Sequence, residues 1–114
     1  ERAACGFLEK QGYTILERNY KCKIGEIDVV ARRDGRIIFV EVKTRTSAQF
    51  GTPQEAVDLK KQEKIFKLAQ WYLKEKKIEK VPVAFDVVAV LWKEEDLPEM
   101  RLIQDAFEKG DERY

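Results

Sequence analysis

The chain has 114 residues, of which 44% are hydrophobic and 38% charged, with 22 basic residues, 21 acidic residues and no histidine. This length suits a single domain, expected to span residues 1–107 and to leave 108–114 as a charged C-terminal tail. A net charge of +1 excludes tight nucleic-acid binding driven by the field of the whole molecule, so any such binding either uses a local basic patch or is weak. The absence of histidine excludes Ser-His-Asp triads and leaves carboxylates, lysine and metal ions for catalysis.

The two cysteines, Cys5 and Cys22, form no CxxC pair and are too few for a zinc cluster or a disulfide framework. We expect them to be structural thiols without a functional role. No apolar run approaches the ~18 residues of a membrane span. The longest run, 81–92, is interrupted by Asp86. The protein is therefore expected to be cytoplasmic and to have no membrane partner.

The N-terminal part of the chain predicts a helix followed by a strand. Apolar residues recur at helical spacing over residues 2–11, and Gly12 is a typical stop signal. Residues 13–20 then favour a strand.

Two apolar runs, 24–31 and 37–43, predict a β-hairpin. The Asp34-Gly35 pair between them is a strong signal for a two-residue turn, and it fixes which residues face one another. Because the side chains of a strand alternate between its two faces, one face of this hairpin is wholly apolar. We expect that face to be core, with the residues Ile27, Val29, Ala31, Ile38, Val40 and Val42.

The other face carries polar residues in facing pairs, Asp28 with Glu41 and Glu26 with Lys43. Two carboxylates directly opposite one another repel, so another group has to offset the repulsion. A divalent cation with oxygen ligands is the natural candidate, and a neighbouring ammonium can orient a metal-bound water or stabilise charge on a phosphoryl oxygen. The pattern is thus typical of metal-assisted phosphodiester hydrolysis. The alternative is an edge hairpin with solvated charges, where Glu26 and Lys43 form a surface ion pair of little energetic weight.

The rest of the chain predicts one long helix and two strands. Thr52-Pro53-Gln54-Glu55 combines an N-cap, a proline at the first helical position and a capping box, and the helix is expected to run to about Lys77. A break at residues 58–61 stays open as an alternative. Residues 83–92 favour a strand in the sheet interior, and residues 101–106 favour an edge strand. This order gives an α/β fold with a mixed central sheet flanked by helices.

Several further residues allow two interpretations. Arg45 either clamps a phosphate on the carboxylate face or is an exposed charge at a strand end. Lys60 and Lys61 either reach a substrate phosphate or belong to a solvated helix face, which is the favoured interpretation. Asp86 is expected to be structural and to pair with a lysine or arginine of a neighbouring strand. Three aromatic residues are expected to be core or interface residues in preference to base-stacking platforms: Trp71, Trp92 and Phe85.

The spacing of the polar pairs resembles that of a known group of nucleases. Asp28 followed by Glu41-Val42-Lys43 is similar to the metal-binding aspartate and the E-x-K element of the PD-(D/E)XK superfamily. Over essentially its whole length the chain also resembles the small bacterial YraN family, whose members resemble archaeal Holliday-junction resolvases. The segments that carry this resemblance are Gly25-Glu26-Ile27-Asp28, Phe39-Val40-Glu41-Val42-Lys43-Thr44-Arg45, Phe50-Gly51, Glu55-Ala56-Val57 and Phe85-Asp86-Val87-Val88.

The resemblance implies a restriction-endonuclease-like core and a metal-dependent endonuclease that acts on DNA, with branched or junction structures as candidate substrates. Two alternatives stay open. One is a non-catalytic nucleic-acid-binding or assembly module that keeps the nuclease fold. The other is a chain that works only as a homodimer, since a two-fold symmetric junction requires paired active sites.

The resemblance also implies roles for individual residues. The metal ligands for Mg²⁺ or Mn²⁺ would be Asp28, Glu41 and the carbonyl of Val42. Lys43 would position or activate the attacking water, and Glu1 and Glu26 would be auxiliary carboxylates. Apart from the resemblance, the candidate nucleic-acid contacts are the residues weighed above, Arg45, Lys60 and Lys61.

Overall fold

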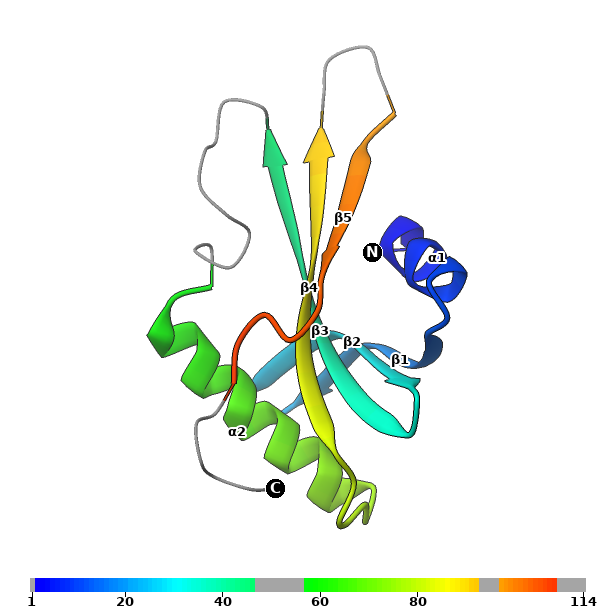
Figure 1. Ribbon diagram of the computed structural model, residues 1–114. Helices are drawn as coiled ribbons and strands as arrows, with labels where there is room; N and C mark the ends of the chain where they lie inside the picture. Colours follow the sequence, from blue (N-terminus) through cyan, green and yellow to red (C-terminus); the bar gives the residue numbers. More distant parts are fainter. Residues whose placement is uncertain (1, 47–56, 93–96, 109–114) are drawn as a thin grey trace.

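The computed structural model describes residues 2–46, 57–92 and 97–108 of the chain. Its elements in chain order are α1 (Arg2–Lys10), β1 (Thr14–Cys22), β2 (Gly25–Arg33), β3 (Arg36–Thr46), α2 (Leu59–Glu75), β4 (Val83–Trp92) and β5 (Glu99–Ile103). The strands form one sheet in the order β1-β2-β3-β4-β5 (Figure 1). All neighbours are antiparallel except β3 and β4, which run parallel because α2 carries the chain back between them. This is the predicted α/β fold with a mixed sheet.

The two helices lie against opposite faces of the sheet, each over its own apolar core (Figure 1). Under α2, Leu68 and Tyr72 pack with Phe39 of β3. Under α1, Leu8 packs with Val40, the next residue of the same strand. Each such side chain contributes about 1.5–3 kcal/mol by leaving water. The central strands are therefore held from both sides, which makes them a rigid support for any polar group that they carry.

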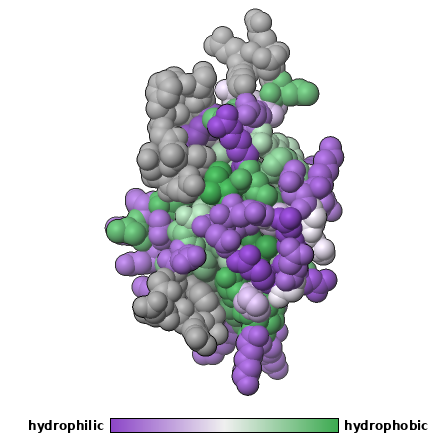
Figure 2. All heavy atoms as spheres, in the orientation of Figure 1, coloured by the Kyte–Doolittle hydropathy of each residue, from purple (hydrophilic) through white to green (hydrophobic). Residues whose placement is uncertain are grey.

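The face of the molecule drawn in Figure 2 is mixed in character. Where residues are coloured in Figure 2, hydrophilic side chains separate smaller hydrophobic areas. Phe85 is 3% exposed and belongs to the core, whereas Trp71 and Trp92 are 38% and 51% exposed. The expectation of a core or interface position is confirmed for Phe85, and a core position is wrong for both tryptophans. In the described segments no helix is long and apolar enough to cross a bilayer.

The predicted hairpin is present, with Asp34 (φ 51°) and Gly35 (φ 75°) in the left-handed conformation that its turn requires. Main-chain pairing follows the predicted register as far as Val29 opposite Val40. The register that brings the polar residues of the two strands toward one another is thus set by the turn.

One residue of the predicted apolar face lies on the wrong side. Ile27 packs in the core under α2, whereas Val29 packs in the core under α1, although residues two apart on a regular strand share a face. The alternation is interrupted at Asp28, opposite which Asn19 of β1 adopts a left-handed conformation with φ 52°. This turns the end of the β1–β2 ribbon so that Ile27 and Tyr20 face α2 together. The other residues of that face lie on the α1 side as predicted: Val29, Ala31, Ile38, Val40 and Val42.

Helix α2 begins at Leu59, because Asp58 is its N-cap and accepts a hydrogen bond from the backbone N–H of Lys61 at 2.8 Å. The predicted capping box at residues 52–55 lies outside the described residues. Since Val57 and Asp58 are not helical, no continuous helix runs from residue 52 to Lys77, and the break considered near residue 58 is confirmed.

Asp86 is 2% exposed, and its partners differ from the prediction. The hydroxyl of Tyr13 donates to its Oδ2, and the backbone N–H of Asp105 donates to its Oδ1 at 2.9 Å. A pairing with lysine or arginine is therefore wrong. Burial raises the pKa of Asp86 and so disfavours its charged form. The phenol of Tyr13 and the amide of Asp105 supply its hydrogen bonds, so no cationic partner is needed.

The last strand is an edge strand as predicted, but it covers residues 99–103 instead of 101–106. Asp105 leaves the ladder because its backbone N–H bonds Asp86, and the next amide, that of Ala106, donates to the Phe85 carbonyl at 2.8 Å. The chain thereby turns across the sheet and brings Phe107 under α2.

Candidate active site

The face of β3 that turns toward α2 changes from apolar to ionisable along the strand. Ile37 and Phe39 pack under the helix. Glu41 and Lys43 continue the same row, because β3 pairs with β4 without a register shift and side chains alternate. Glu41 is 7% exposed and Lys43 is half-buried. The predicted placement of these two residues on one side is confirmed.

Asp28 reaches the same place from β2. Its Oδ2 accepts a hydrogen bond from the backbone N–H of Val42 at 2.8 Å, in place of a ladder bond between main chains. The N–H and C=O groups of one strand residue point toward the same neighbouring strand, so the carbonyl of Val42 is directed to this side as well. The carboxyl group of Glu41 is close enough to Asp28 to form a hydrogen bond with it. The convergence of the two carboxyl groups is therefore as predicted.

The charges in this cluster strongly influence one another. Burial raises the pKa of Glu41 to about 7, and the charge and hydrogen bond of Asp28 act in the same direction, against the opposing ammonium groups of Lys61 and Lys43. Burial lowers the pKa of Lys43, and the adjacent Lys61 lowers it further. Carboxyl and ammonium groups whose pKa values are shifted by burial and by one another are a recognised mark of a functional site.

A cavity of about 310 Å³ opens beside Asp28 and Glu41, between β2, β3 and α2, and Lys43 is not among its lining residues. The acidic side chains of Glu26, Asp28 and Glu41 line one part of it, and Ile65 and Leu68 of α2 form an apolar part. Two further lysines of α2, one helical turn apart, complete the wall: Lys61 and Lys64. The cavity thus places anionic and cationic groups on facing walls.

Gly25 allows α2 to approach this closely. Its φ is +150°, and a Cβ atom there would lie 3.2 Å from Cε of Lys64 and 3.6 Å from the methyl carbons of Leu68. Glycine adopts this backbone conformation without strain, whereas an L side chain rarely does. An added Cβ would also require the flexible end of the Lys64 side chain to shift by a few tenths of an ångström. The Gly25-Glu26-Ile27-Asp28 segment therefore combines a packing residue with a carboxylate.

The other predicted site residues are placed as follows. Glu26 lines the cavity but is exposed, and Lys60 is exposed on α2 outside the cavity wall. Arg45 follows Lys43 on the same row, and its Nη1 donates to the carbonyl of Thr44 at 2.9 Å. Glu1 lies outside the described residues.

Lys64 is the cavity residue that the sequence did not suggest. Its signal was available, because it follows Lys61 by three residues and precedes the buried Leu68 by four. It was missed because the sequence does not indicate in which direction one lysine among many on a charged helix points.

The donor set is compatible with a hard divalent cation. Across residues 2–46, 57–92 and 97–108, no group of three or more Asp, Glu, Cys or His side chains is arranged to hold a metal ion. Mg²⁺, however, typically takes only one or two protein carboxylates and completes its shell with water. One oxygen of Asp28 is committed to Val42 N–H, which leaves the other, the carboxyl of Glu41 and the carbonyl of Val42 as hard donors. A cation there would relieve the repulsion that helps to raise the pKa of Glu41.

Fold and site together define the class: an α/β protein whose described strands form a mixed five-stranded sheet, consistent with a restriction-endonuclease-like core, with carboxylates and lysines between β2, β3 and α2. The model of the uncharacterised protein family UPF0102 matches residues 1–90. The chain therefore belongs to the UPF0102 family, also called the YraN family, and the resemblance seen in the sequence is confirmed.

Relatives in this family match most of the chain. The UPF0102 protein of Caldanaerobacter subterraneus subsp. tengcongensis is 50% identical over 97 residues, which cover 85% of this chain and 80% of the relative. That of Syntrophus aciditrophicus is 48% identical over 108 residues, covering 95% and 84%. That of Moorella thermoacetica is 46% identical over 108 residues, covering 94% and 90%. These names state the family and no activity.

Proposed function

We propose that the protein is a metal-dependent endonuclease that hydrolyses phosphodiester bonds of DNA in the cavity between β2, β3 and α2. The observation that carries this proposal is the meeting of the Asp28 and Glu41 carboxyl groups beside Lys43. Two facing carboxyl groups destabilise a sheet, and such unfavourable arrangements of charge are typical of functional sites.

Asp28, Glu41 and the carbonyl of Val42 would hold Mg²⁺ or Mn²⁺. When bound, such an ion polarises a phosphoryl oxygen and lowers the pKa of a coordinated water. The hydrogen bond from Val42 N–H fixes the orientation of the Asp28 carboxylate before any ion arrives. Preorganisation of this kind avoids a cost of rearrangement during the reaction.

Lys43 acts on the substrate side of the cluster. Its ammonium stabilises the negative charge that develops on the phosphoryl group, or orients the attacking water. Because burial lowers its pKa, its ammonium is also a better proton donor than that of an exposed lysine. Glu26, at the exposed part of the cavity, serves as an auxiliary carboxylate, and Arg45 contacts a phosphate.

The test is a titration of Mg²⁺ and Mn²⁺ with linear, flapped and four-way DNA substrates. We expect cleavage by the wild type and none by Asp28→Asn or Glu41→Gln. A matched control is Glu9→Gln, which changes an exposed carboxylate on α1, the helix on the other face of the sheet. Absence of wild-type cleavage on every substrate, with binding retained, would favour a nucleic-acid-binding module that keeps the nuclease fold.

A further inference from the structure

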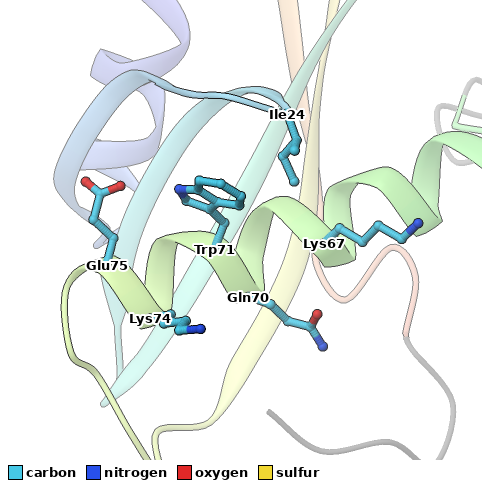
Figure 3. Close-up of a pocket in the computed structure, with 6 residues that line it drawn as sticks. All are labelled: Ile24, Lys67, Gln70, Trp71, Lys74 and Glu75. Carbon is cyan, nitrogen blue, oxygen red and sulfur yellow. The ribbon is translucent and has the colours of Figure 1, made fainter.

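A second cavity, of about 510 Å³, lies beside α2 next to the turn between β1 and β2 (Figure 3). Trp71 and Ile24 supply its large apolar side chains, and Figure 3 shows the indole and the isoleucine side chain approaching each other from the helix and the turn. Both residues are exposed, at 38% and 37%. Its remaining lining residues are Lys67, Gln70, Lys74 and Glu75.

The residues that line this cavity are close in sequence to residues that line the candidate active site, both at the β1–β2 turn and on α2. Ile24 lines it, and the next residue, Gly25, lines the candidate active site. On α2, Lys67 lines it and Lys64, one helical turn earlier, lines the candidate active site. The two cavities therefore lie next to one another along α2, and a polymer that follows the helix from the first would pass the second.

The charge along this path suits a polyanion. Lys64, Lys67 and Lys74 are all exposed and lie at spacings that keep them near one side of the helix. Glu75 is the acidic exception, and its carboxylate is already engaged: it accepts a hydrogen bond from the hydroxyl of Tyr20 at 2.7 Å and lies 3.9 Å from Nζ of Lys76. Figure 3 shows Glu75 turned away from the side chains of Lys67 and Lys74.

We propose that the Trp71 cavity binds an unpaired base of a nucleic-acid strand whose phosphates follow the lysines of α2, so that the preferred substrate carries a single-stranded segment beside the cleavage point. This inference rests on the proposed function, which supplies the strand at the neighbouring cavity. An exposed indole offers a stacking face to any base, and lysines meet the phosphates on either side without reading sequence.

A duplex cannot use the cavity in this way, because its bases are stacked and paired inside the helix. The volume lies within the range of small-ligand sites, about 300–1,000 Å³. The sequence alone favours a core or interface role for Trp71. Its exposure among lysines, directly after the candidate active site, is what points to stacking instead.

The first experiment uses tryptophan fluorescence. The chain has two tryptophans, so Trp92→Phe leaves Trp71 as the sole reporter. We expect a single-stranded oligonucleotide, and a duplex with a single-stranded tail, to quench its emission in Ca²⁺, whereas a blunt duplex of the same sequence does not. Equal emission with and without saturating single strand overturns the proposal.

The second experiment measures affinity for tailed and blunt duplexes in Ca²⁺. Loss of one base-stacking contact predicts that Trp71→Ala binds the tailed duplex about 5- to 140-fold more weakly, with less than about twofold change for the blunt duplex. Trp71→Phe keeps a smaller aromatic face and should fall between the two. The matched control is Trp92→Ala, which removes the other exposed tryptophan, at the end of β4, and should leave both affinities unchanged.

The outcomes separate this inference from the proposed function. A tail preference that depends on Trp71, in a protein that cleaves no substrate with Mg²⁺ or Mn²⁺, supports the stacking cavity and contradicts the nuclease. Cleavage that depends on Asp28 supports the nuclease. If Trp71→Ala and the wild type then bind the tailed duplex with equal affinity, the stacking cavity is contradicted. A wild-type dimer that Trp71→Ala converts to a monomer, as measured by light scattering, identifies the cavity as a self-interface and overturns the proposal.

Discussion

At the scale of single residues, the candidate active site brings two carboxyl groups close together, and their repulsion destabilises the folded protein. Burial is the largest cause that raises the pKa of Glu41 to about 7, and the charge of Asp28 raises it further. The ammonium groups of Lys43 and Lys61 act in the opposite direction. We therefore expect this destabilisation to be measurable in the free energy of unfolding of the metal-free protein.

Asp28→Asn should leave the metal-free protein equally stable or up to about 1 kcal/mol more stable, because it removes one of two facing like charges. The asparagine carbonyl can still accept the hydrogen bond from Val42 N–H, so the geometry is retained. Thermal unfolding in EDTA measures this, and added Mg²⁺ should raise the Tm of the wild type but not of the variant. A lower Tm of the metal-free variant would indicate a structural ion pair instead.

The stability of the metal-free protein should also depend on pH through Glu41. Its folded-state pKa of about 7 lies above the 4.5 of an unperturbed glutamate, so the folded state binds the proton more tightly than the unfolded state. Stability therefore falls as pH rises from about 4.5 to about 7, by up to about 3 kcal/mol. Urea unfolding between pH 5 and 8, in EDTA, should show this slope for the wild type and a flatter profile for Glu41→Gln. Identical profiles would contradict it.

Lys43 separates catalysis from binding. If it stabilises phosphoryl charge or orients the attacking water, Lys43→Ala should lower single-turnover cleavage by a factor on the order of 10² while affinity in Ca²⁺ changes little. Arg45→Ala is the comparison, since a phosphate contact should weaken binding and reduce its salt dependence by about one ion. Cleavage by Lys43→Ala at the wild-type rate under saturating enzyme would exclude the catalytic role.

At the scale of elements, the site depends on how closely α2 approaches β2. The helix supplies Lys61 and Lys64, and the strand supplies Asp28. Gly25, which begins the strand, lies close to Lys64 and Leu68 of the helix. Asp58 caps the same helix and so fixes where its first turn begins.

Gly25→Ala should destabilise the protein by about 1 kcal/mol or more, because alanine is strained at a φ of +150° and its Cβ would press on Lys64 at 3.2 Å. The control is Gly6→Ala in α1, where an added Cβ meets nothing within 4 Å and helix propensity favours alanine by about 0.5–1 kcal/mol. Chemical denaturation compares the two. Equal effects of both substitutions would show that α2 adjusts freely to β2.

At the scale of the whole molecule, the buried carboxyl of Asp86 links distant parts of the chain away from the candidate active site. It is bonded by Tyr13, just before β1, and by the backbone of Asp105, just after β5. The segments next to the two edge strands of the sheet are thereby tied to the interior strand β4.

Tyr13→Phe should lower the free energy of unfolding by about 1–3 kcal/mol, because it removes a donor from a buried carboxyl. Tyr20→Phe is the control and should cost less, since its partner Glu75 is exposed and can turn to water. Neither change should alter metal binding at the candidate active site, which isothermal calorimetry can measure. A larger effect of Tyr20→Phe would reverse the ranking of the two bonds.

The success of prediction from the sequence differed from one element to another for physical reasons. The Asp34-Gly35 turn fixed the register, and β4 has the predicted bounds of 83–92, because turn chemistry and apolar runs act locally. Ile27 was misplaced because a left-handed residue on the neighbouring strand interrupts a period of two. The partners of Asp86 were wrong because they come from residues far apart in the chain, Tyr13 and Asp105.

The sequence by itself determined the hairpin, the row that carries Glu41 and Lys43, and the order of elements, since each follows from contacts between near neighbours in the chain. Only the tertiary structure decided that Lys64 lines the candidate active site and that Trp71 stays exposed beside Ile24. Those placements depend on how α2 lies across β2 and the β1–β2 turn. That arrangement is set by the packing of whole faces against one another, which residue spacing along a single helix does not specify.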